Sequence, residues 1–270
     1  MLEKKYNTGK VTLNYGEGPP NGIPLLLVHG SGSVWQDWTP VIRYFSKLNH
    51  IFALDLRGFG GSQHISGTYE IPTFTNDIAD FIKGVIPTSP IIVGHSLGAL
   101  ITADLARRYP KIPKAIILED PPVSLLENLD QWEGWSYFEM ALDMIRKKTL
   151  KKDAVKRFVE KAGYSPSEAE RSFRNLKQID PEIFEQAITH NMMHLDETIP
   201  AVLKQIQCPC LFISSNYELG SLVKPEDLPI VKRSLKKGSM AHIADAGHGI
   251  HIESPAAYNQ ALMKFLSGIG

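Results

Sequence analysis

The chain has 270 residues, of which 43% are hydrophobic, and its 29 basic side chains balance 29 acidic ones. A chain of this size buries one large core, and α/β folds of this length are often a single domain. The balanced charge gives no attraction to nucleic acid or to an anionic membrane, so neither is expected as a partner. The first residues lack an apolar signal core and no segment approaches 18 continuous apolar residues, which predicts a cytoplasmic protein.

Strand and helix signals alternate along residues 11–119, which predicts a largely parallel sheet with crossover helices. Within this region an apolar, β-branched run leads straight into the pentapeptide from Gly94 to Gly98, with Ser96 at its centre. A buried strand that ends in so tight a turn projects the central hydroxyl away from the sheet. Helical spacing over 100–108 completes a strand–turn–helix unit. Ser96 is therefore the predicted nucleophile.

From about residue 121 to 205 the chain shows helical periodicity and no convincing strand. We expect helices over 132–145, 152–162, 167–178 and 181–193. Strand character resumes at Cys210. The segment also holds large apolar and soft side chains, which suit a pocket for acyl or aromatic groups but also suit packing between helices: Trp132, Trp135, Tyr137, Phe138, Met140, Met144, Met192 and Met193.

A second reactive group is predicted near the C-terminus. Residues 240–244 form a short strand signal, and small residues surround His248 in the loop that follows, before a helix begins near Ser254. A serine hydroxyl is a poor nucleophile unless an imidazole lies within hydrogen-bond reach. Among nine histidines His248 fits best, and His251, three residues later, is the nearest rival.

Taken together, these motifs resemble the α/β-hydrolase fold superfamily over nearly the whole chain. Leu25 to Gly32 resembles the family's strand and His-Gly oxyanion loop, and Ile51 to Ser62 resembles the next strand and its Asp-x-Arg-Gly-x-Gly-x-Ser turn. Gly94 to Gly98 matches the nucleophile elbow, and Ala246 to His248 matches the histidine loop. The resemblance implies a mostly parallel eight-stranded sheet flanked by helices.

The resemblance also implies a core domain and a cap. The core would comprise residues 1–120 and 206–270, and residues 121–205 would form an all-helical cap, or lid, inserted after the sixth strand and covering the nucleophile. Neither a cofactor nor a metal is expected. The two cysteines, Cys208 and Cys210, have no further cysteine to complete a zinc site and are interpreted as free thiols.

The carboxylate that orients His248 has two candidates. Counting forward from the strand at Cys210 to the family's usual acid position gives Glu218, which is the prediction. Some relatives instead place the acid after the preceding strand, which here gives Asp120. Either carboxylate could accept the second imidazole N–H and stabilise the imidazolium.

An oxyanion hole requires two backbone N–H groups aimed at the developing negative charge. Leu97, directly after the nucleophile, supplies one from the start of its helix, where N–H groups lack partners. By resemblance the other comes from the loop after His29-Gly30, most simply from Ser31.

These residues predict a cofactor-free serine hydrolase of carboxylic esters with small to medium apolar groups, acting through an acyl-enzyme. Serine at the elbow argues against the family's epoxide hydrolases and dehalogenases, which use aspartate there. A lactonase or a carbon–carbon bond hydrolase of ring-cleavage products would use the same triad. The latter needs a cation near the substrate carboxylate, and no arginine of the cap stands out as that group. Some relatives with an intact triad instead act as small-molecule receptors. The oligomeric state stays open.

Overall fold

The computed structural model describes residues 1–124, 135–189 and 192–269. Its centre is an eight-stranded sheet with the order β1-β2-β4-β3-β5-β6-β7-β8. The two antiparallel pairs are β1 with β2 and β2 with β4, and every pair from β4 to β8 is parallel. The strands are β1 (Leu2–Asn7), β2 (Thr12–Glu17), β3 (Pro24–Val28), β4 (His50–Leu54), β5 (Ile91–His95), β6 (Ala115–Glu119), β7 (Cys210–Ser215) and β8 (Gly238–Ile243). The predicted mostly parallel sheet is confirmed.

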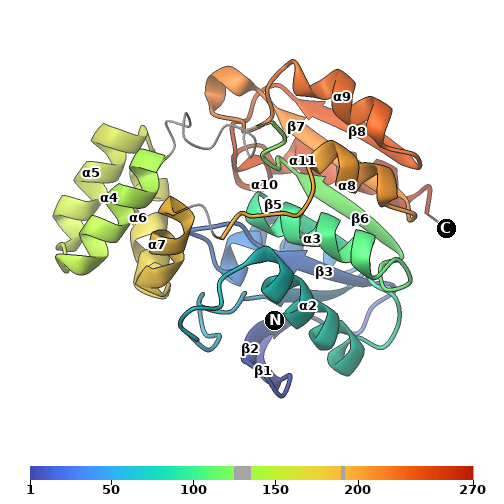
Figure 1. Cartoon of the computed structure of the whole chain (residues 1–270), viewed down its shortest axis with the longest axis horizontal. Coiled ribbons are helices and arrows are strands. Elements are labelled where there is room, and N and C mark those ends of the chain that lie inside the picture. Colours follow the sequence, from blue (N-terminus) through green and yellow to red (C-terminus); the bar gives the residue numbers. More distant parts are fainter. Residues whose placement is uncertain (125–134, 190–191, 270) are drawn as a thin grey trace.

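Helices cover both faces of the sheet (Figure 1). Alternate side chains of β3 enter two separate cores: Leu26 and Val28 pack with residues of α2 and α3, and Leu25 and Leu27 pack with α1 and α11. Burial on both faces explains why the central strands read as continuous apolar runs. The helices of this part are α1 (Thr39–Phe45), α2 (Ile71–Val85), α3 (Leu97–Arg108), α9 (Asp227–Ser234), α10 (Ile250–Glu253) and α11 (Pro255–Leu266), with short 3-10 turns η1 (Trp35–Trp38) and η4 (Tyr217–Leu219).

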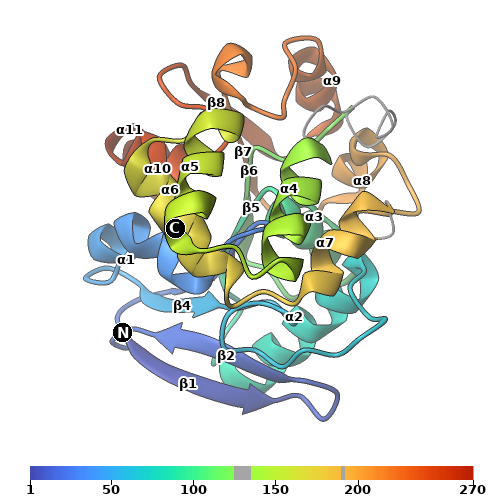
Figure 2. The ribbon, with the colours of Figure 1, turned by 90° about the vertical axis from the view of Figure 1, so that its left-hand side faces the viewer.

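Between β6 and β7 the described elements are all helical, as predicted. They are α4 (Trp135–Arg146), α5 (Lys151–Ala162), α6 (Pro166–Leu176), α7 (Pro181–Ile188) and α8 (Ile199–Gln205). The helix predicted to begin at residue 132 starts, within the described residues, at Trp135, and Trp132 lies outside them. Figures 1 and 2 show α4 to α7 standing beyond one end of the sheet, whereas α8 lies back against the body of the molecule beside α3.

Local signals set several of these boundaries. Ser165 and Glu168 form a reciprocal capping box that starts α6 one residue before the predicted position, with Pro166 in the first turn. Pro255 likewise begins α11, as predicted from the sequence. None of the helices that the structure describes is long and apolar enough to cross a membrane.

The sheet topology creates a crevice at the carboxyl ends of β3 and β5. The chain leaves β3 toward α1 on one face and leaves β5 toward α3 on the other. In open α/β sheets, ligands bind where neighbouring connections diverge in this way. Because β3, β5, β6, β7 and β8 are parallel, the loops that follow them meet at this edge. The edge faces α4 to α7 (Figure 2).

Candidate active site

The turn after β5 holds Ser96 in an unusual conformation. Its φ is 53° and its ψ is −118°, and its N–H donates to the carbonyl of Glu119 at 2.9 Å. Strain of this kind is characteristic of a nucleophile elbow. A β-carbon at Gly94 would lie 2.2 Å from the carbonyl oxygen of Gly98, and one at Gly98 would lie 2.3 Å from that of Val28. Both glycines are therefore required for α3 to pack against β3 and β5.

A second loop passes directly against this turn. A β-carbon at Gly30 would lie 2.9 Å from the β-carbon of Ser96, so only glycine allows this approach. The adjacent His29 is buried, and its ring bridges the Gly30 carbonyl (2.8 Å) and the Leu56 N–H (3.1 Å). Burial lowers the pKa of His29, so the ring is neutral and acts as a brace for the loop.

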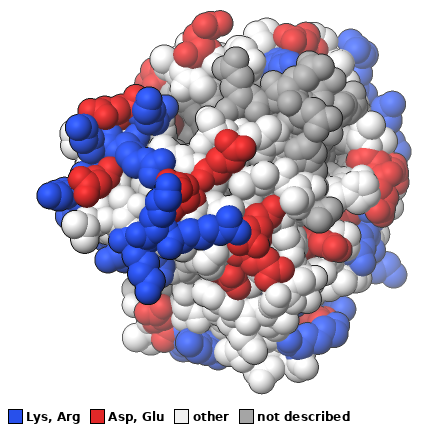
Figure 3. Space-filling view, turned by 60° about the vertical axis from the view of Figure 1, so that its left-hand side comes forward, with Lys and Arg blue, Asp and Glu red and all other residues white. Residues whose placement is uncertain are grey.

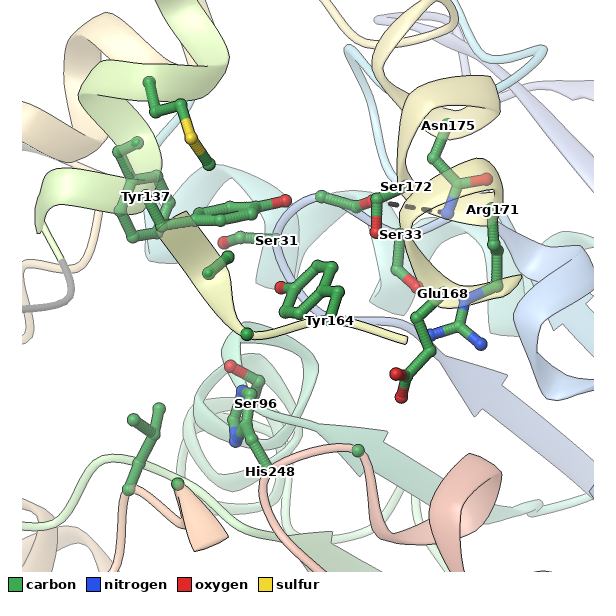
Figure 4. Close-up of a pocket in the computed structure, with 18 of the residues that line it drawn as sticks. Ser31, Ser33, Ser96, Tyr137, Tyr164, Glu168, Arg171, Ser172, Asn175 and His248 are labelled. Carbon is green, nitrogen blue, oxygen red and sulfur yellow. Dashed lines mark hydrogen bonds between the residues drawn. The ribbon is translucent and has the colours of Figure 1, made fainter. Parts of the chain in front are cut away.

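The predicted oxyanion groups, Ser31 and Leu97, both line the same cavity as Ser96. Leu97 is the first residue of α3, so its N–H has no intrahelical acceptor. Ser31 follows Gly30 in the loop against the elbow, and Figure 4 shows it across the cavity from Ser96. The Ser31 and Leu97 backbones therefore come from two segments that meet at the elbow.

His248 and Ser96 line this cavity, and in Figure 4 their side chains point into the same space. The Nδ1 atom of His248 lies 2.7 Å from Oδ2 of Asp120, whose side chain is fully buried, while the His248 side chain is 34% exposed. The carboxylate also accepts from the Ser221 hydroxyl at 2.5 Å and from the Leu222 N–H at 2.9 Å. This network fixes the Nδ1–H tautomer and leaves Nε2 as the acceptor.

The expectation that Glu218 pairs with His248 is wrong, because Asp120 occupies that position. Asn216 caps the short turn η4 by accepting from the Glu218 N–H at 3.0 Å, and this turn leaves Glu218 exposed at the surface. The same loop then returns with Ser221 and Leu222, whose hydroxyl and N–H bind the Asp120 carboxylate. The loop after β7 supports the acid instead of supplying it.

His251, the rival to His248, points away from the cavity. Its ring is 3% exposed and pairs with Glu119, a fully buried carboxylate that the sequence reasoning did not single out. His95, inside the elbow pentapeptide, donates from Nε2 to the His248 carbonyl at 2.9 Å. Burial lowers the pKa of His95 to about 3, so this histidine is also neutral.

The cavity has a volume of about 1080 Å³ and lies between the elbow and the helices α4 to α6. Of the apolar side chains expected to form a pocket or pack the helices, four line it: Tyr137, Phe138, Met140 and Met193. Met144 and Met192 are buried in the core and are not among the residues that line the cavity. The α6 side is polar, with Arg171, Ser172 and Asn175 facing the space beside Tyr164 (Figure 4).

Arg171 is the residue that sequence reasoning missed on this wall. Its side chain is 28% exposed, and its Nε lies 3.8 Å from Oδ1 of Asp37. Asp37 itself is held by the Asn175 amide at 2.7 Å and by the Ser33 hydroxyl. The spacing along α6 is the signal that could have found Arg171. Residues three or four apart share one helix face, and this places four polar residues together: Glu168, Arg171, Ser172 and Asn175.

Two basic side chains at the end of α4 pair with acidic partners. Arg146 pairs with Glu185 at 2.7 Å, and Lys147 pairs with Asp143 at 2.7 Å. Figure 3 shows acidic and basic side chains interleaved over this part of the surface. Among the residues that the structure describes, no group of histidine, cysteine and acidic side chains is arranged to hold a metal ion.

Comparison with known proteins agrees with this fold. The profile of the alpha/beta hydrolase family matches residues 25–261. Lipase 1 of Psychrobacter immobilis is 25% identical over 86% of this chain and 73% of its own length. The (E)-2-((N-methylformamido)methylene)succinate hydrolase of Acinetobacter baylyi is 24% identical over 91% of this chain and 90% of its own. The structure of a malate-bound thermophilic esterase from Thermogutta terrifontis superposes with a TM-score of 0.78 at 21% identity, covering 100% of this chain and 99% of that one.

Proposed function

The chain belongs to the alpha/beta hydrolase family, and from its site we propose that it is a serine hydrolase that cleaves carboxylic esters. The observation that carries the proposal is that His248, paired with the buried Asp120, shares one cavity with Ser96 at a strained elbow. This combination has a chemical use and no structural one, because a strained φ at a half-buried serine destabilises the fold.

In the first half of the reaction, Ser96 Oγ attacks the ester carbonyl while Nε2 of His248 takes its proton. Asp120 holds the Nδ1–H and stabilises the imidazolium that results. The N–H groups of Leu97 and Ser31 bind the oxyanion. His248 then gives the proton to the departing alkoxide, so an alcohol leaves and the acyl group stays on Ser96. In the second half, water repeats these steps, with His248 as base, and releases the acid.

Hydrolysis of a p-nitrophenyl ester series from acetate to decanoate tests this proposal, with Ser96→Ala as the inactive variant. Turnover by the wild type alone is the expected result, with an optimum set by the Tyr137, Phe138 and Met140 wall. No turnover by either protein would contradict the esterase proposal. Slow turnover together with a ligand-induced rise in Tm would instead favour a small-molecule receptor.

Arg171 favours a second candidate function, which is hydrolysis of substrates that bear a free carboxylate. Its guanidinium lies on the cavity wall with a single described ion pair, to Asp37 at 3.8 Å. That distance is long for a charge-assisted hydrogen bond, so the N–H groups of the Arg171 guanidinium remain available to a substrate carboxylate. The Acinetobacter baylyi relative is named for a succinate derivative. A carbon–carbon bond hydrolase of ring-cleavage products would need a cation in such a place.

Paired substrates separate the two candidates. Arg171→Gln should lower kcat/KM for a p-nitrophenyl hemisuccinate by about 10- to 100-fold, as expected for a lost charged hydrogen bond. The neutral butyrate ester should change less than about twofold. Arg174→Gln, an exposed change one turn along α6, is the control. Equal losses on both esters would contradict carboxylate recognition by Arg171.

A further inference from the structure

Two carboxylates stand next to each other where β6 ends, and each binds an imidazole of the segment after β8: one in the loop and one at the start of α10. Asp120 binds His248, as described, and Glu119 binds His251 three residues later. Glu119 accepts from Nδ1 of His251 at 2.8 and 3.0 Å and from the His251 N–H at 2.9 Å. Its side chain is fully buried. The proposed ester hydrolysis uses the Asp120–His248 pair and gives no role to the Glu119–His251 pair.

Aromatic rings pack against the Glu119–His251 pair on two sides. The His251 ring stacks on Trp38 with centroids 4.0 Å apart and planes 21° from parallel. The ring of His95 lies edge-on to it at 5.2 Å. Burial alone would raise the pKa of Glu119, but the neighbouring His251 imidazole and the hydrogen bonds from His251 bring that pKa below its ordinary value. The carboxylate is therefore ionised and accepts both N–H groups.

Glu119 also touches the nucleophile through its backbone. Its carbonyl accepts the Ser96 N–H at 2.9 Å, while its side chain binds His251 on α10. The His248 carbonyl is held in turn by His95, the residue before Ser96. One residue thus connects the elbow with the histidine loop, independently of the Asp120 contact.

We propose that Glu119 and His251 form a positioning pair that holds the His248 loop at the reacting distance from Ser96. The proposal rests on the serine-hydrolase function above. A buried polar pair is weak evidence for stability, because well-packed apolar residues of similar volume serve as well. What the polar pair adds is directionality, since three hydrogen bonds define one orientation of the loop. Displacement of a reacting group by about 1 Å costs about 100-fold in rate, so such a tether acts on kcat.

Two variants test the pair. Glu119→Gln keeps the shape and removes the charge, and Glu119→Leu with His251→Phe replaces both partners by apolar groups, which preserves the fold better than removing one. The control is Asp77→Asn, which removes a buried carboxylate that binds Arg57 away from the cavity, with Nε–Oδ2 at 2.5 Å. Glu119→Gln and Asp77→Asn should lower Tm by a few degrees, and the double apolar variant should lower it less.

The discriminating readouts are kinetic and spectroscopic. In both Glu119 variants kcat on p-nitrophenyl butyrate should fall about 10-fold or more with KM within about twofold, and Asp77→Asn should keep kcat. The low-field proton NMR signal of the His248 Nδ1–H, assigned by its loss in His248→Gln, should broaden or shift in both Glu119 variants and stay in Asp77→Asn. An unchanged signal with unchanged kcat in a folded Glu119 variant would overturn the proposal.

The NMR signal needs no substrate, so it separates this inference from the proposed function. If the wild type hydrolyses no ester but its His248 signal still depends on Glu119 and not on Asp77, the positioning pair stands and the esterase proposal fails. If the wild type is an active esterase but its His248 signal is unchanged in the Glu119 variants, the esterase proposal stands and the positioning pair fails.

Discussion

Replacing Asp120 by asparagine removes the charge that orients His248 and leaves the backbone undisturbed. Asp120 has a φ of 45°, in the left-handed region that asparagine also tolerates, so the local fold should persist. The amide can present its oxygen to the His248 Nδ1–H and the Leu222 N–H while its NH₂ donates to Ser221 Oγ. The Nδ1–H tautomer is then kept, and the main loss is stabilisation of the imidazolium.

The expected loss of kcat in Asp120→Asn follows from the orientation of the asparagine amide. An aspartate-to-asparagine change that traps the wrong tautomer costs about 10⁴-fold in kcat in the serine protease triad. With Ser221 available as an acceptor, we expect on the order of 10³-fold here, which is about 4 kcal/mol of transition-state stabilisation. Steady-state kinetics on p-nitrophenyl butyrate measure it, with circular dichroism as the check on folding.

Glu218→Gln is the matched change at the other candidate acid. Because Glu218 is exposed on η4, the kcat of the Glu218→Gln variant should stay within about twofold of the wild-type value. A large loss in Glu218→Gln together with near-normal activity in Asp120→Asn would refute the assignment of the acid.

Two further predictions concern stability. Gly98→Ala would place a β-carbon 2.3 Å from the Val28 carbonyl oxygen, so it should lower the free energy of unfolding, measured in urea, by about 3 kcal/mol. Gly163→Ala should lower it by only about 1 kcal/mol, because there only the positive φ matters. Equal losses would contradict the packing argument. The pKa of His95 falls to about 3 in the fold, so the unfolded chain binds the extra proton between that pH and about 6.5, and stability is lost as pH falls through this window. The free energy of unfolding should drop by about 2 kcal/mol from pH 7 to pH 5 through this group, and His95→Gln should show a correspondingly flatter profile.

Ser96 and His248 could be named as candidates from local sequence because each depends on its own short segment. A strand–turn–helix with small flanking residues predicts an exposed hydroxyl, and a small-residue loop predicts an accessible imidazole. The sheet and the helical insertion were predicted for the same reason, since their periodicity is a local property. The predicted nucleophile and imidazole line one cavity, as that interpretation requires.

The acid could not be chosen because the choice depends on three-dimensional proximity. The loops after β6 and β7 both reach His248, and only the packing of Ser221 and Leu222 around Asp120 decides between them. Glu119 escaped notice for the same reason, although consecutive acidic residues at the end of a buried strand, together with two histidines three residues apart, were a visible signal. Arg171 required knowing which face of α6 meets the cavity.

The most direct test of the account is covalent labelling of the intact protein by a fluorophosphonate, followed by mass spectrometry of the labelled peptide. We expect one adduct per chain, on Ser96, formed rapidly in the wild type, slowed strongly in His248→Gln and absent in Ser96→Ala. Labelling at another residue, or equal labelling of Ser96→Ala, would contradict the claim that Ser96 is the nucleophile of a serine hydrolase.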